Sequence, residues 1–333
     1  MKNFPKLDKF VLSLLVMIGV ARLWPHPAMY EGLIDLGLLS DIGITLIFFF
    51  YGLKLNPRKL RQDLGNWRLH FLVQGSTFIL FPFLVFPFFH FFEGGEYYLL
   101  ALGFFFLASL PSTVSSSVVM VSIAKGNIPG AIFNASISSL LGIFITPLWM
   151  GWVIAAGTIE LGSFSGILLK LLLQVFVPVL LGLLLNRFWG HWAYKNARFL
   201  KLFDQSIILL VVYLSFAESF VLGLFDNSSW LDLFWVAVGS LLLFGIAYII
   251  IGFLAKKMAF SREDIITATF AGSKKSLVHG TVMAGIIFAD FAGVGIILLP
   301  IMVYHALQLV LVSWIAQRKV AMISSNKKTP DIS

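Results

Sequence analysis

Residues 110–117 read Leu-Pro-Ser-Thr-Val-Ser-Ser-Ser, and residues 271–276 read Ala-Gly-Ser-Lys-Lys-Ser. Each run interrupts a long apolar stretch near its middle. Pro111 has no N–H, and its ring clashes with the carbonyl four residues earlier, so a helix breaks just before it. Gly272 and its neighbouring serines predict a second unwound segment. Non-helical backbone is tolerated at membrane depth only inside protein or beside a water-filled cavity. The two runs therefore predict a pair of broken membrane helices.

The composition of the whole chain indicates a membrane protein. Of its 333 residues, 59% are hydrophobic and 12% are charged, whereas a soluble domain has about 45–50% apolar and about 25% charged residues. Disordered chains have low hydrophobicity and are excluded. The absence of Cys excludes disulfides and Cys-ligated metals. The net charge of +8 is spread over the termini and alternate loops, which indicates membrane topology and not a nucleic-acid partner.

Ten apolar stretches are long enough to cross a bilayer, which takes roughly 20 helical residues. They span residues 8–24, 35–54, 69–91, 97–124, 127–152, 164–186, 204–225, 230–255, 263–288 and 291–317. The two interrupted runs lie in the fourth and the ninth stretch. Little of the chain is left for a soluble domain, and residues 319–333 form a short tail.

The charged residues predict the orientation in the membrane. Lys and Arg gather at both ends of the chain and in alternate loops, for example within residues 54–68 and 187–201. The opposite loops carry acidic residues such as Glu31, Glu93 and Glu96. By the positive-inside rule, both termini lie in the cytoplasm and the protein spans the cytoplasmic (inner or plasma) membrane.

The chain divides into two halves of five crossings, residues 8–152 and 164–317. Because five is an odd number, the second half enters the membrane from the opposite side. Interrupted segments at matching places in two inverted halves are the best sequence pointer to the site of a secondary transporter. We therefore predict an all-α membrane protein with ten transmembrane helices in two inverted five-helix repeats, in which helices 4 and 9 are discontinuous.

The first break offers a row of hydroxyl groups. They belong to Ser112, Thr113, Ser115, Ser116 and Ser117. These hydroxyls could coordinate a cation, or they could bind the backbone groups that the break sets free. The alternative is a kinked helix in which they serve only as small packing residues.

The second break holds two adjacent lysines, Lys274 and Lys275, between Ser273 and Ser276. A basic residue at the centre of a membrane helix costs about 2.5–3.5 kcal/mol, and two neighbours on a helix would point in different directions. We expect an unwound stretch that faces a cavity and binds an anionic solute. The alternative is that one lysine reaches the interface and the other forms a structural ion pair.

Further polar residues lie at membrane depth. Glu218 in the seventh stretch is the candidate counter-ion of the lysines and a candidate for coupling, and Asp41 is the other acid in such a position. Gln74 is a lone amide in the third stretch. The other candidates for coupling or support are His279, Tyr304, His305 and Gln308. Each histidine could relay protons or only form a packing hydrogen bond.

Enzyme chemistry has little support in the sequence. It contains no H-E-x-x-H or G-x-S-x-G motif, no Gly-rich phosphate loop and no carboxylate pair at helical spacing in mid-membrane. An intramembrane hydrolase with a serine nucleophile and Lys274 as base is the least favoured alternative. We expect no enzymatic activity, no cofactor and no metal centre. The expected partners are a small anionic solute and the lipid bilayer.

Several groups of residues together resemble the bile acid:sodium symporter family, and in particular its divergent bacterial branch related to the seventh mammalian member. They are residues 47–53 (Ile-Phe-Phe-Phe-Tyr-Gly-Leu), 66–70 (Asn-Trp-Arg-Leu-His), 110–117, 272–277, and Leu299-Pro300 with Tyr304, His305 and Gln308. The resemblance covers nearly the whole chain. It implies a core domain of helices 3–5 and 8–10 beside a panel domain of helices 1, 2, 6 and 7.

The resemblance also implies where sodium ligands would lie. Gln74 matches a glutamine on helix 3, and Ser116 and Ser117 fall near ligands that follow the bend in helix 4. Asn134, Ser136 and Ser138 offer polar groups on helix 5. These positions imply a cation site beside the first break.

Helix 9 departs from the family pattern. The family's acidic position falls at Phe270, and the Gln and Asn that follow it fall at Lys274 and Lys275. We expect a fixed ammonium to replace a bound sodium ion, so that transport is independent of sodium and a proton is the other candidate coupling ion. The predicted function is secondary active transport of a small organic anion by alternating access. The alternative is a membrane protein that does not transport and regulates calcium entry through a partner.

Overall fold

The computed structural model describes residues 9–29, 35–55, 65–153, 164–226, 230–289, 291 and 293–326, and all regular structure in these residues is helical. The first half contains α1 (Lys9–Leu23), α2 (His26–Met29), α3 (Leu36–Lys54), α5 (Trp67–Gly75), η1 (Ser76–Leu80), α6 (Phe81–Phe91), α7 (Tyr98–Ser109), α8 (Ser115–Ile123) and α9 (Ile128–Val153). The second half contains α10 (Phe164–Leu171), η3 (Leu172–Phe176), α11 (Val177–Lys195), α12 (Ala197–Val221), α13 (Trp230–Lys257), α14 (Arg262–Gly272), α15 (Leu277–Ile287) and α16 (Val294–Asn326).

Seven helical segments of the described chain are long and apolar enough to cross a membrane, which confirms an all-helical integral membrane protein. They are Leu36–Lys54, Trp67–Phe91, Ile128–Val153, Leu169–Lys195, Ala197–Val221, Trp230–Lys257 and Val294–Lys319. The other three predicted stretches hold shorter helices. α1 has 15 residues, and the fourth and ninth stretches are each divided in two, as the sequence predicted.

Three helices extend well beyond their predicted stretches. α11 continues to Lys195, α12 begins at Ala197 and not at residue 204, and α16 continues to Asn326. Hydropathy marks the part of a helix that lies in hydrocarbon, whereas the backbone hydrogen bonds continue into charged turns. The sequence therefore located these crossings but placed their ends too early or too late.

The third predicted stretch is one continuous helix with a wider π-helical turn in its middle, η1. Pro82 follows this turn and cannot donate a backbone hydrogen bond. The N–H of Phe81 binds the carbonyl of Ser76, so the carbonyls of Thr77 and Phe78 must find partners elsewhere. The indole Nε1 of Trp149 donates to the Phe78 carbonyl at 2.9 Å.

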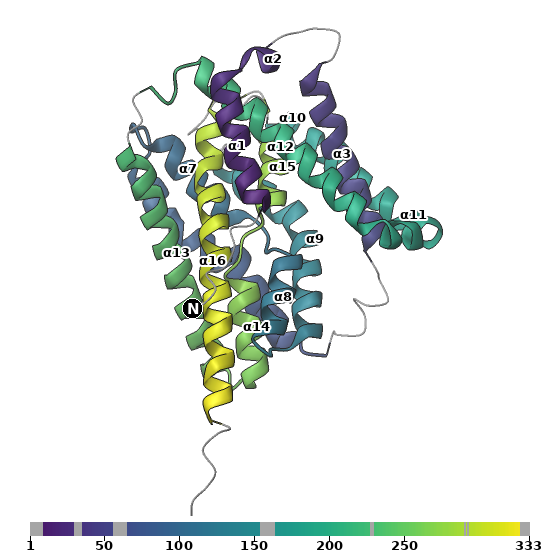
Figure 1. Cartoon of the computed structure of the whole chain (residues 1–333), viewed down its shortest axis with the longest axis vertical. Coiled ribbons are helices and arrows are strands. Elements are labelled where there is room, and N and C mark those ends of the chain that lie inside the picture. Colours follow the sequence, from purple (N-terminus) through teal and green to yellow (C-terminus); the bar gives the residue numbers. More distant parts are fainter. Residues whose placement is uncertain are drawn as a thin grey trace, which may run out of the picture.

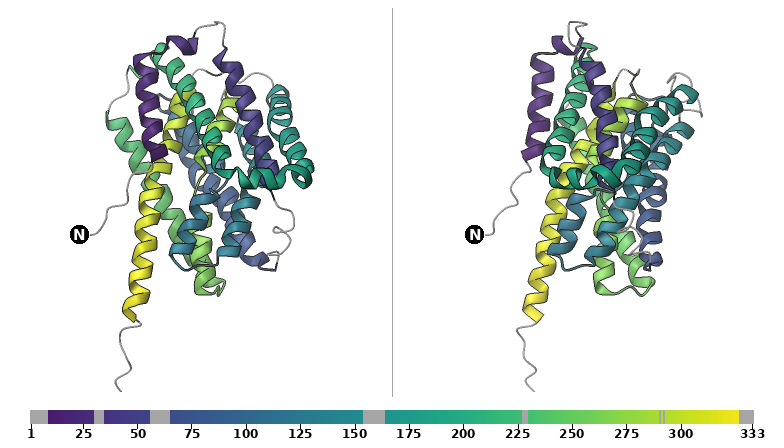
Figure 2. Two further views of the ribbon diagram at one scale, coloured as in Figure 1. Left: turned by 45° about the vertical axis from the view of Figure 1, so that its right-hand side comes forward. Right: turned by 90° about the vertical axis from the view of Figure 1, so that its right-hand side faces the viewer.

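The helices can be described as two groups, which contact each other where α12 packs against α15 and α16. In the first group α3 packs along α11 and α1 along α12. Gly52 and Gly182 bring α3 and α11 into backbone contact, because a Cβ on either residue would collide with a carbonyl of the other helix. The second group contains α5–α9 and α13–α16. In Figures 1 and 2, α3 and α11 end about midway along the long axis, whereas α8, α14 and α16 continue below that level.

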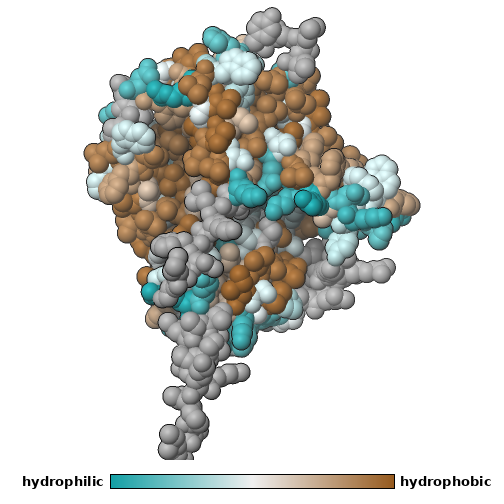
Figure 3. All heavy atoms as spheres, in the orientation of Figure 1, coloured by the Kyte–Doolittle hydropathy of each residue, from teal (hydrophilic) through white to brown (hydrophobic). Residues whose placement is uncertain are grey.

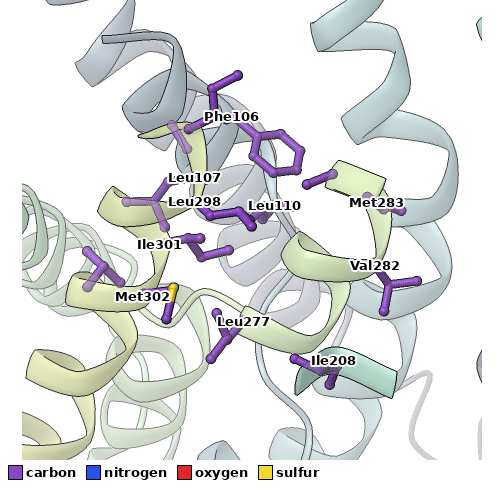
Figure 4. Packing of buried hydrophobic residues seen from close by; sticks show 14 of the residues in the cluster. Phe106, Leu107, Leu110, Ile208, Leu277, Val282, Met283, Leu298, Ile301 and Met302 are labelled. Atoms are coloured by element: carbon purple, nitrogen blue, oxygen red, sulfur yellow. The ribbon is translucent and has the colours of Figure 1, made fainter. Parts of the chain in front are cut away.

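The main apolar core lies where α7, α12, α15 and α16 meet (Figure 4). It includes Phe106, Leu110, Ile208, Met283 and Ile301. The outer surface is apolar as well, since large side chains such as those on α11 and α13 are exposed. Figure 3 shows this apolar surface over the upper part of the molecule. An exposed apolar surface of this extent is typical of a protein that contacts lipid.

Candidate functional site

The first break separates α7 from α8 at residues 110–114. One face of α9 supplies hydrogen-bond partners for the backbone groups at this break. The Ser138 hydroxyl accepts a hydrogen bond from the Ser112 N–H at 2.9 Å, and the Thr146 hydroxyl donates to the Ser109 carbonyl at 2.8 Å. Between them, the ring of Pro111 packs onto the bare backbone of Gly142. Ser138, Gly142 and Thr146 are spaced four residues apart, so they share one face of the helix.

The second break separates α14 from α15 at residues 273–276 and lies directly against the first. The Ser276 N–H donates to the Pro111 carbonyl at 2.9 Å, and the Ser112 hydroxyl donates to the Ala271 carbonyl at 2.6 Å. Each break therefore satisfies backbone groups that the other leaves free. The two segments are about 160 residues apart in sequence and form one buried crossing.

Two side chains of α16 hold the second break in place. The Gln308 carboxamide accepts from the Lys275 N–H at 2.9 Å and donates to the Lys275 carbonyl at 2.8 Å. The Tyr304 hydroxyl donates to the Ser273 carbonyl at 2.6 Å. His305 contacts the Gln308 amide through Nδ1 at 2.9 Å. These candidates from the sequence thus lie at the crossing, where they bind backbone and one another.

Lys275 is fully buried, and its ammonium lies among backbone carbonyls. Nζ donates to the carbonyls of Thr77, Ala108 and Leu110 at 2.7, 2.6 and 2.8 Å. It also lies 4.3 Å from the centre of the Phe81 ring, within the range of a cation–π contact. The expected cavity-facing role is therefore wrong for Lys275, because protein atoms take up all three of its side-chain donors.

Lys274 is equally buried but has different surroundings. Nζ donates to the Ser116 hydroxyl at 3.1 Å, and the other two N–H groups have no hydrogen-bond partner among the described residues. Ser116 is also hydrogen-bonded to Thr113 at 2.8 Å, and Thr113 to Ser117 at 2.9 Å. The hydroxyls of the first break thus form a chain that ends on the Lys274 ammonium.

The N-termini of α8 and α15 both begin at the crossing. Ser276 caps α15, since its hydroxyl accepts from the His279 N–H at 3.3 Å. Val114, the N-cap residue of α8, provides no side-chain cap, and Ser116 lies in the first turn of this helix. A helix N-terminus carries a partial positive charge and favours an anion. Lys274 and the start of α8 therefore add two positive potentials at one place.

His279 connects this crossing to the other group of helices. Its Nδ1 is hydrogen-bonded to the Ser276 hydroxyl at 3.0 Å. Its ring meets those of Phe48 and Tyr51 on α3 edge to face, with centroids 6.4 and 5.8 Å apart. The Tyr51 hydroxyl donates to the Ser136 carbonyl at 3.1 Å. The crossing thus lies at the boundary between the two helix groups.

Gln74 and Asn134 form a separate polar pair. Gln74 Nε2 donates to the Asn134 carbonyl and to Oδ1 at 3.0 and 3.1 Å. Asn134 Nδ2 contacts His70 Nδ1 at 2.9 Å. Gln74 also lines an apolar groove of about 520 Å³ between the third crossing and α9. Ser136 is partly buried, and its hydroxyl donates to the Ile132 carbonyl of its own helix.

Glu218 is not the counter-ion of the lysines. It lies half-buried on α12, and in the described chain neither Lys274 nor Lys275 contacts a carboxylate. Three backbone carbonyls surround the Lys275 ammonium, and the Lys274 ammonium is bound by the Ser116 hydroxyl. Asp41 does not pair with them either. Of Ser115, only the backbone position at the start of α8 is described.

Sequence reasoning missed three residues that build the site, namely Thr77, Gly142 and Thr146. A sequence pattern could have identified Gly142 and Thr146, because together with Ser138 they form a face of small residues on an otherwise apolar helix. The sequence signal for Thr77 is weaker. Pro82, five residues later, has no N–H that could pair with the Thr77 carbonyl. Only the folded chain shows that Lys275 is its partner.

Two broken helices that cross inside an all-helical membrane protein, with helix N-termini and a buried ammonium at the crossing, define a site of the kind found in membrane transporters. The chain belongs to the SBF-like CPA transporter family, whose model matches residues 8–320. This membership confirms the resemblance to the bile acid:sodium symporters and identifies a membrane transporter of that type.

Relatives that match this chain over nearly their whole length are found in bacteria and in vertebrates. PA2026 of Pseudomonas aeruginosa is 38% identical over 93% of this chain and 92% of its own. YfeH of Escherichia coli, whose name proposes a symporter, is 36% identical over 96% of this chain and 94% of its own. Sodium/bile acid cotransporter 7 of Xenopus tropicalis is 27% identical over 96% of both chains.

Proposed function

We propose that this protein is a secondary active transporter that moves a small organic anion across the cytoplasmic membrane by alternating access. The observation that carries the proposal is the Lys274 ammonium. It is buried beside the N-terminus of α8, whose N-cap residue Val114 provides no side-chain cap, and two of its donors have no partner in the described chain. A buried charge with unused hydrogen-bond donors is costly unless a ligand completes it. A carboxylate, sulfate or phosphate group offers the acceptors that are needed.

The proposed architecture has ten crossings in two inverted halves, with both termini in the cytoplasm. The breaks in the fourth and ninth stretches support it, because they lie at matching places in the halves and bond to each other. The two helix groups would be the moving parts. Their offset along the long axis (Figures 1 and 2) supports a displacement of one group past the other.

The test begins with a thermal-stability screen of the purified protein against carboxylates, sulfates and phosphates of increasing size. A ligand at a hundred times its Kd stabilises the folded state by about 2.7 kcal/mol. The anion that stabilises most is then offered to sealed vesicles containing the protein, with and without sodium and proton gradients. We expect saturable uptake that an unlabelled excess of the anion abolishes.

Empty vesicles control for leakage. Stabilisation by cations or neutral solutes only, or an anion that binds but is never taken up, would contradict the proposal. The second result would favour the alternative of a membrane regulator that does not transport.

A further inference from the structure

We infer that Lys275 is a built-in monovalent cation: its ammonium fills a cage of backbone carbonyls that would otherwise need a bound ion. Shortening this side chain would open a site for a free monovalent cation. The inference concerns the folded crossing itself and does not depend on whether the protein transports an anion.

The carbonyls of the cage lie where two prolines interrupt the helical hydrogen bonds. Pro82 has no N–H for the Thr77 carbonyl, with which residue 82 would pair in the π-helical turn. Pro111 ends α7, so the carbonyls of Ala108 and Leu110 face the break. The N–H of Ser112, which would continue the helix to Ala108, is already bound to Ser138. These three oxygens converge from two crossings onto one point.

The number of carbonyl acceptors in the cage matches the number of donors on an ammonium, and the surroundings of the cage favour a positive charge. Three acceptors lie 2.6–2.8 Å from Nζ, and an ammonium has three N–H donors. A neutral amine would have only two donors and would leave one buried carbonyl unpaired. The end of α7 adds the negative end of its helix dipole, and the Phe81 ring adds its negative face. Rings of backbone carbonyls hold free ions in the same way in cation channels.

Lys275 differs in this respect from its neighbour. Lys274 binds a hydroxyl and keeps two donors unused among the described residues, whereas all donors of Lys275 are taken by the polypeptide. Lys275 joins the third crossing and both broken helices through one group. It therefore positions the crossing and would not touch the transported anion.

The experiment compares thermal unfolding of the purified full-length protein in ammonium, potassium, sodium and choline chloride at equal ionic strength. Choline is too large for the cage and sets the baseline. We expect the wild-type Tm to be the same in all four salts. We expect Lys275→Ala to lower the Tm in choline by about 5–10 °C, because unpaired buried carbonyls cost free energy. Ammonium chloride should then restore most of this loss in a saturable manner.

Two control variants keep the test decisive. Lys275→Met fills the space without donors or charge, so it should lower the Tm in every salt and should not respond to ammonium. Lys274→Ala leaves the cage intact and should show no cation-specific recovery. A Lys275→Ala variant that no monovalent cation stabilises beyond choline would overturn the inference. If that variant cannot be purified, a Lys275→Met variant with the wild-type Tm would overturn it, and a lowered Tm would support it.

Discussion

Lys274 and Lys275 are chemically identical neighbours, yet their ammonium groups have different partners. The backbone from 274 to 276 is not helical, so the two side chains are not held at the spacing that a helix imposes on neighbours. One ammonium therefore enters the carbonyl cage, and the other reaches the hydroxyls at the start of α8. Unwinding the helix for a few residues is what allows two adjacent charges to be buried in different places.

At the residue scale, we predict that Lys274→Gln weakens binding of the anion found in the stability screen by about 10- to 100-fold, since a hydrogen bond to a charged group contributes about 1.5–3 kcal/mol. The measurement is a titration of Tm or of binding heat against the anion. Lys257→Gln is the matched control, because it removes the same charge from an exposed helix end. Equal affinities of wild type and Lys274→Gln would show that this ammonium does not contact the ligand.

Glu218 keeps an open role in coupling. The structure places it half-buried on α12, and in the described chain it forms no hydrogen bond or ion pair with either lysine. Its predicted contribution to coupling therefore cannot act through direct pairing with Lys274 or Lys275. His279 and Tyr51 lie between the two helix groups, so relative motion of the groups would change their contact.

At the scale of elements, the break in helix 4 depends on α9. Ser138, Gly142 and Thr146 replace the hydrogen bonds and the space that a continuous helix would provide for itself. A small-residue face that receives a proline ring is a form of close helix packing expected in membranes.

We predict that Gly142→Ala destabilises the protein by about 1–3 kcal/mol, because the new methyl group would collide with the Pro111 ring. Thermal unfolding should show a lower Tm. Gly245→Ala on α13 is the matched control, since nothing lies within 4 Å of a Cβ at that position, and alanine favours a helix more than glycine does. If both variants had the same Tm, the close packing of Pro111 on α9 would not contribute to stability.

At the scale of the whole molecule, the proposed topology can be tested by cysteine labelling, because the chain contains no Cys. In intact cells, a membrane-impermeant maleimide should label Glu96→Cys, which lies in an acidic loop. Lys257→Cys should be labelled only after permeabilisation. Both positions are exposed in the structure. The opposite pattern would refute the assigned orientation, and labelling of both in intact cells would exclude the proposed number of crossings between them.

The sequence by itself determined the class of the protein and the places where its helices break. Hydropathy and charge are properties of consecutive residues, so their pattern along the sequence indicates the membrane crossings directly. Pro111 and Gly272 interrupt helices locally, whatever surrounds them. Many of the polar residues at the crossing were singled out from the sequence as well, since polar groups at membrane depth are rare and must be enclosed by protein.

Only the tertiary structure decided what each of these residues does. The partners of Lys275 are backbone carbonyls of Thr77, Ala108 and Leu110, and any residue type can supply a carbonyl, so no sequence pattern identifies them. The same holds for Gly142, which matters because the Pro111 ring packs onto its backbone. Which buried charge is satisfied by the protein and which is left for a ligand depends on contacts between segments far apart in the chain, and these exist only after folding.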